Sequence, residues 1–228
     1  MKISIIIPTF NEGKTLPQII DMSLKNLKYE IELIVVDDCS TDNTRDILSK
    51  SYSKSDKIKI IYNLKNMGKG FCVRKGIEYS SGNIILIQDA DLEYNPKEHN
   101  RLIDPIAENV ADVVYGSRFV GQDPHRVIYF FNRIANSFLT TVCNILTNLN
   151  LTDMETGLKA FKSDQIKKII LKEDGFGIEP ELTIKLSKLK FFEVGISYYG
   201  RTYEEGKKIR AKHFFEAIFV MLKYKFLK

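Results

Sequence analysis

The sequence comprises 228 residues, of which 44% are hydrophobic and 28% charged, a composition typical of one sizeable globular domain and not of a disordered chain. The net charge is +5, and the segment from Arg201 to Lys228 holds eight lysines and arginines against three acidic residues, so the first 200 residues are neutral and no nucleic-acid partner is expected. The three cysteines are odd in number and widely spaced, which excludes a disulfide framework or a cysteine zinc site and indicates a reducing, cytosolic compartment.

The first half of the sequence alternates between short β-branched runs and helical patterns. The N-terminal apolar run stops at Pro8, which makes it too short for a signal peptide and typical of a buried first strand. The predicted strands are residues 3–7, 31–38, 57–63 and 83–91, and the predicted helices between them are residues 14–27, 42–50 and 68–80. This alternation predicts a doubly wound α/β fold with a mostly parallel sheet and flanking helices, in which ligands bind beyond the carboxyl ends of the strands.

The second half is less regular. We expect a strand within residues 111–119 and another within residues 191–200. Residues 134–152 are uncharged but contain nine Ser, Thr and Asn side chains, which favours an amphipathic helix over a membrane span. The apolar face of this helix is predicted to hold Ile134, Phe138, Val142, Ile145 and Leu149.

The basic C-terminal segment has an amphipathic pattern of its own. Without an internal repeat or a linker, residues 1–209 are predicted to be one domain and residues 210–228 an amphipathic basic helical tail. The tail is expected either to pack on the domain or to anchor it peripherally to an anionic membrane. Its apolar stripe holds Phe214, Phe215, Ile218, Phe219 and Leu222, with Lys212, Lys223, Lys225 and Lys228 around it.

Three carboxylates directly follow the fourth predicted strand. Asp89 and Asp91 are separated by Ala90, and Glu93 comes two positions later. Hard oxygen ligands suit Mg²⁺ or Mn²⁺, which usually share their coordination with ligand phosphates. The alternative is a solvated acidic turn.

The ends of the first two strands are also polar. After the second strand, Asp37 and Asp38 are expected to bind a base or a ribose, because paired carboxylates with no basic neighbour repel each other unless a ligand compensates. Thr41 or Asp42 is expected to cap the next helix. Farther along, Lys69 and Arg74 accompany two glycines where a diphosphate could meet a helix N-terminus. The spacing is not that of a P-loop, and no dinucleotide fingerprint follows the first strand.

The second half of the sequence contains four basic residues that stand apart from one another. Arg118, Arg133, Lys159 and Arg201 each stand in a polar context, as a metal–diphosphate site with a second anionic substrate would require, although any one of them alone is compatible with an ordinary surface residue.

Taken together, these segments resemble the family 2 glycosyltransferases of GT-A fold, and most of all the dolichyl-phosphate mannosyltransferase-like, or polyprenyl-phosphate glycosyltransferase, branch. The resemblance covers residues 3–209 in family order. It rests on SIIIPTFNE, VVDDCSTDNT, NMGKG, QDADLEYNP, YGSRF, NLTDMETGLKAF, FGIEPELT and SYYGRTYEEGKKI.

The resemblance implies an inverting transfer of a hexose from a UDP- or GDP-sugar to a polyprenyl phosphate on the cytoplasmic face of a membrane, with Mg²⁺ or Mn²⁺ and possible help from a separate membrane subunit. It implies a metal site of Asp89, Asp91 and Glu93, the last of which is often Gln in this branch. For the nucleotide sugar it implies Pro8, Thr9, Asn11, Glu12, Asp37 or Asp38, Lys69, Arg74, Asp89 and Ala90. For the acceptor phosphate it implies Arg118, Arg133 and Ser137. The candidate catalytic residues are Asp91, Arg118, Asp153, Lys159 and Arg201, and Gly157 falls in the same segment as Asp153 and Lys159.

Three other functions remain open at this point. A family 2 enzyme with a saccharide or glycolipid hydroxyl acceptor would need a general base, for which Asp153 and Glu179 are candidates, whereas a phosphate acceptor is already anionic. A sugar nucleotidylyltransferase is disfavoured because PTFNEGK stands where its glycine-rich, arginine-bearing loop would be. A silent, membrane-associated nucleotide-binding protein is disfavoured by the retained carboxylates.

Overall fold

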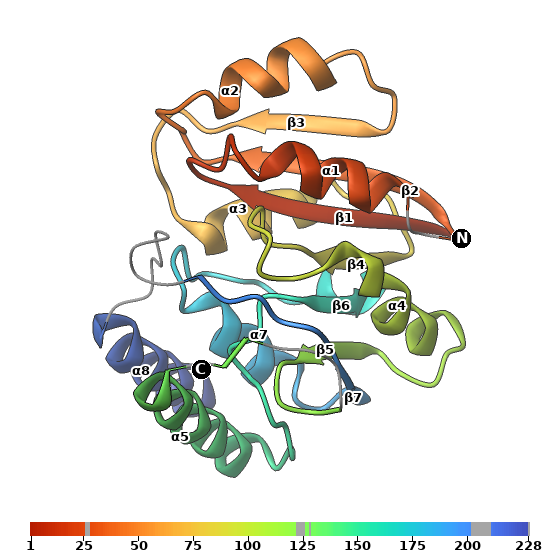
Figure 1. The fold of residues 1–228 in the computed structure, drawn as a ribbon. Helices are drawn as coiled ribbons and strands as arrows, with labels where there is room; N and C mark the ends of the chain where they lie inside the picture. The colour runs from red at the N-terminus through yellow and green to blue at the C-terminus, as the bar shows by residue number, and fades with distance from the viewer. Residues whose placement is uncertain (26–27, 122–125, 128, 202–210, 228) are drawn as a thin grey trace.

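The computed structural model describes residues 1–25, 28–121, 126–127, 129–201 and 211–227. Its centre is a seven-stranded sheet in the order β3-β2-β1-β4-β6-β5-β7 (Figure 1). The first four strands, β1 (Lys2–Thr9), β2 (Glu30–Asp37), β3 (Ile58–Tyr62) and β4 (Ile84–Ile87), run parallel, as predicted. The predicted α/β fold class is therefore confirmed.

The other half of the sheet contains an element that the sequence pattern did not indicate. Strand β6 (Lys159–Lys162) lies antiparallel between β4 and β5 (Val113–Ser117), and β7 (Phe191–Gly195) pairs in parallel with β5 at the edge. Four residues are too few to show a strand period, so only the pairing with two neighbours identifies β6.

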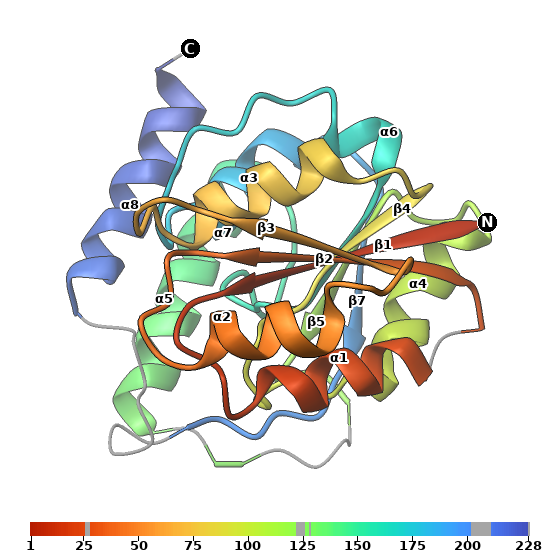
Figure 2. The same cartoon turned by 90° about the horizontal axis from the view of Figure 1, so that it is seen from above.

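Helices cover both faces of the sheet (Figure 2). On one face lie α1 (Leu16–Lys25), α2 (Thr44–Ile47) with the π-helical turn η1 (Leu48–Tyr52), and α4 (His99–Ala107), which follows the 3₁₀ turn η2 (Pro96–Glu98). On the other lie α3 (Lys69–Tyr79), α6 (Ser163–Ile166) and α7 (Ile178–Leu186). The predicted helices 14–27, 42–50 and 68–80 correspond to α1, to α2 with η1, and to α3.

The strands are apolar on both faces because each face is covered. In β1, Ile3, Ile5 and Ile7 join the core under α1 and α4, whereas Ile6 joins the core under α3 and α7. Alternate residues of a strand point to opposite faces, so a strand buried on both sides needs a continuous apolar run.

Beside this sheet lie two long helices that pack against each other. They are α5 (Phe130–Thr147) and α8 (Ala211–Phe226) (Figure 1). They pack through a shared cluster that includes Leu139 and Cys143 of α5 and Ala217 and Met221 of α8. The basic tail thus packs on the domain. Residues 202–210, which carry the tail's start and part of its charge, lie outside the described residues.

The apolar stripe predicted for residues 134–152 has an unexpected orientation. Ile134, Phe138 and Ile145 are 49%, 51% and 76% exposed, while the buried face of α5 holds Leu139, Thr140 and Cys143. The helix ends at Thr147, so Leu149 lies beyond it. Within the described ranges, no helix combines the length and apolarity needed to cross a bilayer.

Candidate active site

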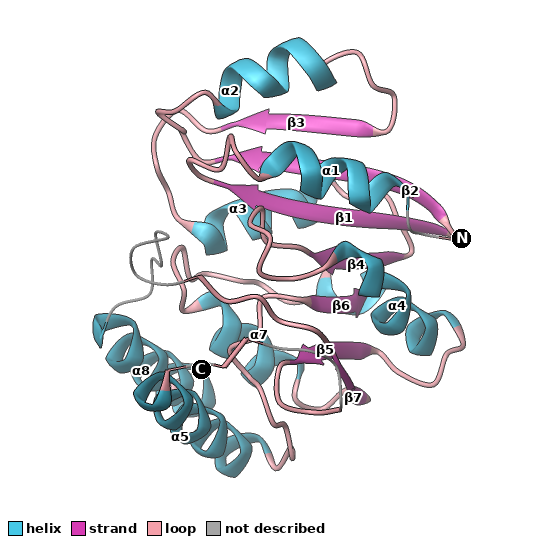
Figure 3. Cartoon of the chain, viewed as in Figure 1, coloured by secondary structure: helices cyan, strands magenta, loops and turns pink. Residues whose placement is uncertain are grey.

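The loops that leave the carboxyl ends of β1, β2 and β4 meet at one edge of the sheet (Figure 3). They enclose a cavity of about 350 Å³ together with residues from α3, α7 and the loops around β5, β6 and β7. Of the predicted site residues, the cavity is lined by Pro8, Thr9, Glu12, Asp38, Lys69, Asp89, Ala90, Asp91, Glu93, Arg118 and Arg201. Its lining also includes Phe10, Asn66, Gly68, Cys72, Tyr94, Glu155, Gly157, Phe176, Glu179 and Tyr198.

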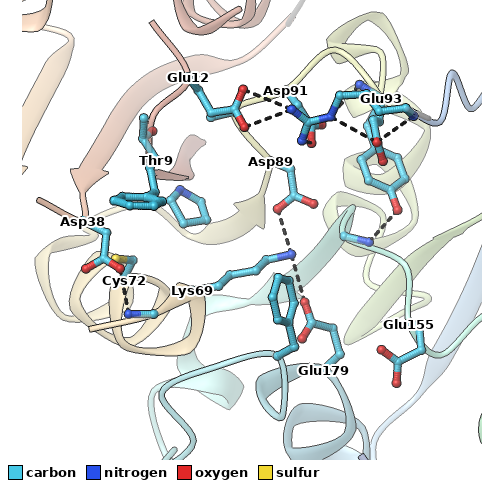
Figure 4. A pocket seen from close by; sticks show the side chains of 18 of the residues that line it. Thr9, Glu12, Asp38, Lys69, Cys72, Asp89, Asp91, Glu93, Glu155 and Glu179 are labelled. Carbon is cyan, nitrogen blue, oxygen red and sulfur yellow. Dashed lines mark hydrogen bonds and ion pairs between the residues drawn. The ribbon is translucent and has the colours of Figure 1, made fainter. Parts of the chain in front are cut away.

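At one end of the cavity, Asp38 organises the loop that precedes α3. Its Oδ1 accepts hydrogen bonds from the Met67 amide (2.8 Å) and from Asn63 Nδ2 (2.9 Å), and its Oδ2 accepts one from the Gly68 amide (2.7 Å). Gly68 adopts φ +98°, and its Cα hydrogen faces the Asp174 carbonyl so closely that no side chain would fit. Asp38 therefore shapes one wall of the cavity as well as lining it (Figure 4).

Asp37 lies outside the cavity lining. It is fully buried, and Arg45 Nε donates to its Oδ2 at 2.6 Å. The expectation that no basic residue neighbours the Asp37–Asp38 pair was thus wrong. Arg45 follows Asp37 by eight residues, lies on α2 and contacts the Asp37 carboxylate. This leaves Asp38 as the member of the pair that faces the cavity.

Asn11 and Arg74 also lie outside the lining. Asn11, at φ +55°, uses its side-chain oxygen to accept from the Thr41 amide at 2.8 Å and so joins the loops after β1 and β2. Arg74 binds Asp174 and the Glu173 carbonyl. Five residues of helix separate Arg74 from Lys69, a rotation of roughly 140°, so the two cations cannot face the same ligand from α3.

Lys69 connects two carboxylates across the cavity. Its Nζ lies 2.8 Å from Asp89 Oδ1 and 2.9 Å from Glu179 Oε1 (Figure 4). Although burial acts against the charged lysine, the two carboxylates hold its pKa well above the usual value. Lys69 is therefore a fixed cation between the loop after β4 and the first turn of α7.

Arg201 occupies the centre of a second carboxylate group. Its Nη1 lies 3.2 Å from Glu12 Oε1, its Nη2 contacts Asp91 Oδ2, and its Nε lies 3.3 Å from Glu93 Oε1. The Arg201 amide also donates to Glu93 at 2.9 Å. One guanidinium thus joins three carboxylates from the loops after β1 and β4.

The carboxylates predicted to hold a metal are engaged by these cations. Among the described residues, no three His, Cys, Asp or Glu side chains are already arranged around a common metal position. The donor set nevertheless fits a hard divalent ion, because Asp89, Asp91 and Glu93 all line the cavity with oxygen ligands. Burial, and then the charges of Asp89 and Glu93, raise the pKa of Asp91 to about 7. Additional positive charge here would therefore be stabilising, and Arg201 would have to release Asp91 and Glu93 to admit it.

Arg118 is held by Asp153 in a two-pronged ion pair, with Nε to Oδ2 at 2.6 Å and Nη2 to Oδ1 at 2.7 Å. Asp153 is fully buried and is not part of the cavity lining. Both of its oxygens already accept hydrogen bonds from Arg118, so Asp153 is poorly placed to remove a proton from an acceptor.

Arg133 lies next to Arg118 but outside the cavity. The guanidinium carbons of Arg133 and Arg118 lie 3.4 and 5.4 Å from the centre of the Phe119 ring. Ser137 is one helical turn after Arg133 on α5, and both are exposed. The structure therefore places Arg133 and Ser137 at the surface, close to Arg118 at the border of the cavity.

Lys159 supports the loop before β6. It is 1% exposed, and its Nζ donates to the carbonyls of Met154 (3.0 Å) and Thr156, the two residues that flank Glu155. Burial lowers the pKa of Lys159 to about 8. It is absent from the cavity lining, so its action on a ligand would pass through the loop that it holds.

Glu155, Tyr94 and Tyr198 line the cavity although no sequence pattern marked them. A lone glutamate in a loop carries no pattern, although Glu155 stands two residues from the recognised Asp153 and Gly157. The tyrosine rings lie 5.4 Å apart between the centres, and Tyr198 donates to Glu93 at 2.9 Å. This pair joins the loop after β4 to the segment after β7 and so positions Arg201.

Residues 4–170 match the model of the Glycosyl transferase family 2. The chain belongs to this family. It is 32% identical over 221 residues to a dolichol-phosphate mannosyltransferase of Pyrococcus furiosus, covering 95% of this chain and 61% of that one. It is 28% identical over 211 residues to an undecaprenyl-phosphate 4-deoxy-4-formamido-L-arabinose transferase of Proteus mirabilis, covering 90% of this chain and 62% of that one. The chain thus spans about three fifths of the length of these two relatives.

The fold of this glycosyltransferase is also found among solved structures. Glucosyl-3-phosphoglycerate synthase from Mycobacterium tuberculosis, in complex with Mn²⁺, UDP and phosphoglyceric acid, superimposes with a TM-score of 0.77 at 18% identity, covering 100% of this chain and 79% of that one. This likeness confirms the GT-A fold, and the family match confirms that the chain is a glycosyltransferase.

Proposed function

We propose that this glycosyltransferase transfers a hexose, with inversion, from a nucleoside diphosphate to a polyprenyl phosphate at the cytoplasmic face of a membrane. The observation that carries the proposal is the meeting of Asp89, Asp91 and Glu93 with the cations Lys69 and Arg201 in the cavity beyond β4. Carboxylates for a divalent ion and cations for phosphate oxygens together suit a metal-bound diphosphate.

The donor would lie along the cavity with its nucleoside beside Asp38 and its diphosphate beside Asp89 and Asp91. Bound Mg²⁺ or Mn²⁺ would supply charge stabilisation for the departing nucleoside diphosphate. Asp89, Asp91 and Glu93 would hold the ion, and Arg201, displaced from them, would bind a phosphate oxygen. Crystals of structural neighbours that contain Mn²⁺ or Mg²⁺ with UDP are consistent with this assignment.

The acceptor phosphate would bind at Arg118 and Arg133, with Ser137 as a hydrogen-bond donor. A phosphate is anionic near neutral pH, so it attacks without a strong general base. This matches a site in which Asp153 is engaged by Arg118. The named activities of the two polyprenyl-phosphate relatives support the same acceptor.

The lipid part of the acceptor would lie along α5. Phe130, Phe131, Ile134 and Phe138 are exposed on this helix, which also carries Arg133. Helix α8 continues this apolar surface through Phe215, Phe219 and Leu222, and Phe138 contacts Phe214 with the ring centres 5.7 Å apart. Lys225 on α8 is exposed and suits anionic headgroups, whereas Lys223 is paired with Glu173 at 2.7 Å. We therefore propose that the protein docks peripherally on the membrane through both α5 and α8, and not through the basic tail alone.

The test is a panel of UDP- and GDP-hexoses incubated with a short-chain polyprenyl phosphate and Mn²⁺ or Mg²⁺, with lipid-linked sugar as the product. We expect one nucleotide sugar to give product, and Asp91→Ala to abolish nearly all turnover while the exposed-residue control Asp164→Ala retains it. Unchanged turnover in Asp91→Ala would contradict the metal–diphosphate assignment.

The same assay separates the acceptor classes. Arg133→Ala and Ser137→Ala should each lower transfer to the lipid phosphate. If both retain full activity, and a saccharide or glycolipid hydroxyl accepts the sugar instead, the hydroxyl-acceptor function replaces the one proposed here.

A further inference from the structure

Two carboxyl groups in the cavity have no part in the metal–diphosphate assignment. Glu155 Oε1 and Glu179 Oε2 are buried oxygens without a hydrogen-bond partner among the described residues. Both residues line the cavity, and Glu179 is only 4% exposed. A buried polar atom without a partner costs roughly 1–3 kcal/mol, so it is seldom retained without a ligand or a water to satisfy it.

The position of the pair relates it to the diphosphate. Lys69 joins Glu179 to Asp89, and a side chain at Gly157 would collide with the Asp89 carboxylate, so the loop carrying Glu155 packs directly against the loop after β4. Figure 4 shows Glu155 and Glu179 on one side of Lys69 and Asp89, and Glu12, Asp91 and Glu93 on the other. The group bonded to a diphosphate at Asp89 would thus lie next to Glu155 and Glu179.

Glu155 is held firmly in this position. Lys159 Nζ binds the carbonyls on both sides of it, and the Met154 amide donates to Thr140 Oγ1 at 3.2 Å. Burial, and then the charge of Glu179, raise the pKa of Glu155 to about 8, with Lys159 and Arg118 acting in the opposite direction and Asp153 adding to the increase. Two neighbouring carboxyl groups offer several hydrogen-bonding oxygens, which matches the hydroxyl groups of a sugar.

We propose that the carboxyl groups of Glu155 and Glu179 bind hydroxyl groups of the donor hexose and thereby determine which sugar the enzyme accepts. This inference rests on the proposed function, since it takes the diphosphate to lie at Asp89 and Asp91. Hydroxyl recognition by buried polar groups discriminates strongly, because an analogue that lacks the hydroxyl leaves those groups unpaired.

The test measures donor binding and needs no acceptor. With Mn²⁺ present, calorimetry gives the Kd of the preferred nucleotide hexose, of its 2-, 3-, 4- and 6-deoxy analogues and of the nucleoside diphosphate alone. For the wild-type protein, we expect removal of one or two particular hydroxyls to weaken binding roughly 10- to 100-fold. In Glu155→Ala, the analogue that lacks the hydroxyl bound by Glu155 should bind as tightly as the complete nucleotide hexose. The nucleoside diphosphate should keep its wild-type Kd.

Glu155→Gln, which preserves the side-chain shape, covers the case in which the alanine variant does not fold, and Glu108→Gln, at the exposed residue that follows α4, is the matched control. The Gln variant should change the ranking of the deoxy analogues, and the control should not. An unchanged ranking in both Glu155 variants, with intact nucleoside diphosphate binding, would overturn this inference alone. If no nucleotide hexose bound to the wild-type protein, the proposed function would itself be overturned, and the inference with it.

Discussion

Arg118 and Asp153 form a buried two-pronged ion pair, with nitrogen–oxygen distances of 2.6 and 2.7 Å. Asn136 Nδ2 also donates to Asp153, at 3.3 Å, and thereby ties α5 to the same carboxylate. The pair fixes the Arg118 side chain at the border between the cavity and α5. Its loss would affect folding as well as function.

Replacing Asp153 with Asn should lower the free energy of unfolding by about 3–5 kcal/mol, because it leaves the buried Arg118 guanidinium without its counter-charge. Chemical denaturation of the wild-type and variant proteins measures the difference. The double variant Arg118→Met/Asp153→Leu should recover part of the loss, since it removes both charges together. A single variant as stable as the wild type would show that water reaches the pair and replaces the lost interaction.

Removing the Arg201 guanidinium should make the free protein bind Mn²⁺ more tightly. Arg201 occupies oxygens of Asp91 and Glu93 that the ion would need, so Arg201→Gln eliminates a competitor. We expect about tenfold tighter Mn²⁺ binding without nucleotide, equivalent to ~1.4 kcal/mol, measured by electron paramagnetic resonance titration. Sugar transfer should fall, because the same side chain is assigned to the diphosphate.

The control for this change is Arg101→Gln, which alters an exposed arginine of α4 whose Nη1 binds the Gly195 carbonyl. It should leave the Mn²⁺ affinity at the wild-type level. Equal affinity in Arg201→Gln and the wild type would mean that Arg201 and the ion do not compete for these carboxylates.

The exposed aromatic residues of α5 and α8 should be required for membrane binding. Phe131 is 80% exposed and Phe219 63%. Burying one Phe side chain contributes roughly 1.5–3 kcal/mol, so Phe131→Ser/Phe219→Ser should weaken binding to anionic vesicles more than tenfold. Co-sedimentation with phosphatidylglycerol vesicles measures this, and neutral phosphatidylcholine vesicles report the contribution of charge. Tyr79→Ser, at an exposed aromatic of α3, is the matched control; equal losses in both variants would argue against a specific membrane face.

Glu32 should make stability depend on acid pH. Burial acts to raise its pKa, but hydrogen bonds from Lys2, Ser4 and Ser81 outweigh burial and hold the pKa well below the usual value of the free side chain. A lowered folded-state pKa stabilises the protein above the pKa of the unfolded chain, about 4.3, and this stabilisation disappears as the pH falls farther.

Glu32→Gln should therefore cost about 1–3 kcal/mol at pH 7, with the difference from the wild type narrowing below roughly pH 4. Urea denaturation at pH 7, 5 and 3.5 measures the trend. Glu30→Gln, at the exposed start of β2, should show no comparable pH dependence. A wild-type advantage that stays constant from pH 7 to pH 3.5 would show that the Glu32 charge is not its source.

The parts of the fold that could be predicted from sequence are those with long, regular patterns. The apolar runs of β1, β2 and β4 indicated parallel strands, and the polar residues that end them indicated the edge of the sheet where Glu12, Asp38 and Asp89 meet. Strand β6 escaped prediction because four residues carry no period, and its place between β4 and β5 depends on pairing with segments more than forty residues away.

The predicted positions of individual side chains differ from those in the structure where the side chain pairs with a residue that the sequence pattern did not indicate. Asp37 is balanced by Arg45, and Arg74 by Asp174. Spacing along the chain predicted that Asp37 and Arg74 would lie near the ligand. The direction of each side chain depends instead on how its strand or helix is oriented and on which other segment packs beside it.

The amino-acid sequence by itself determined that this chain forms an α/β domain, belongs among the family 2 glycosyltransferases and gathers carboxylates beyond one strand, because hydrophobic period and local motifs are properties of neighbouring residues. Only the tertiary structure decided that Arg201 lies among Glu12, Asp91 and Glu93, and that Glu155 and Glu179 face the same cavity, each with an oxygen that has no partner in the described part of the chain. It also decided that Ile134, Phe138 and Ile145 of the predicted stripe are exposed, while Val142 packs into the cluster shared with α8. These relationships join residues far apart in the chain, and the energies of burial and ion pairing that set them depend on distances that exist only after folding.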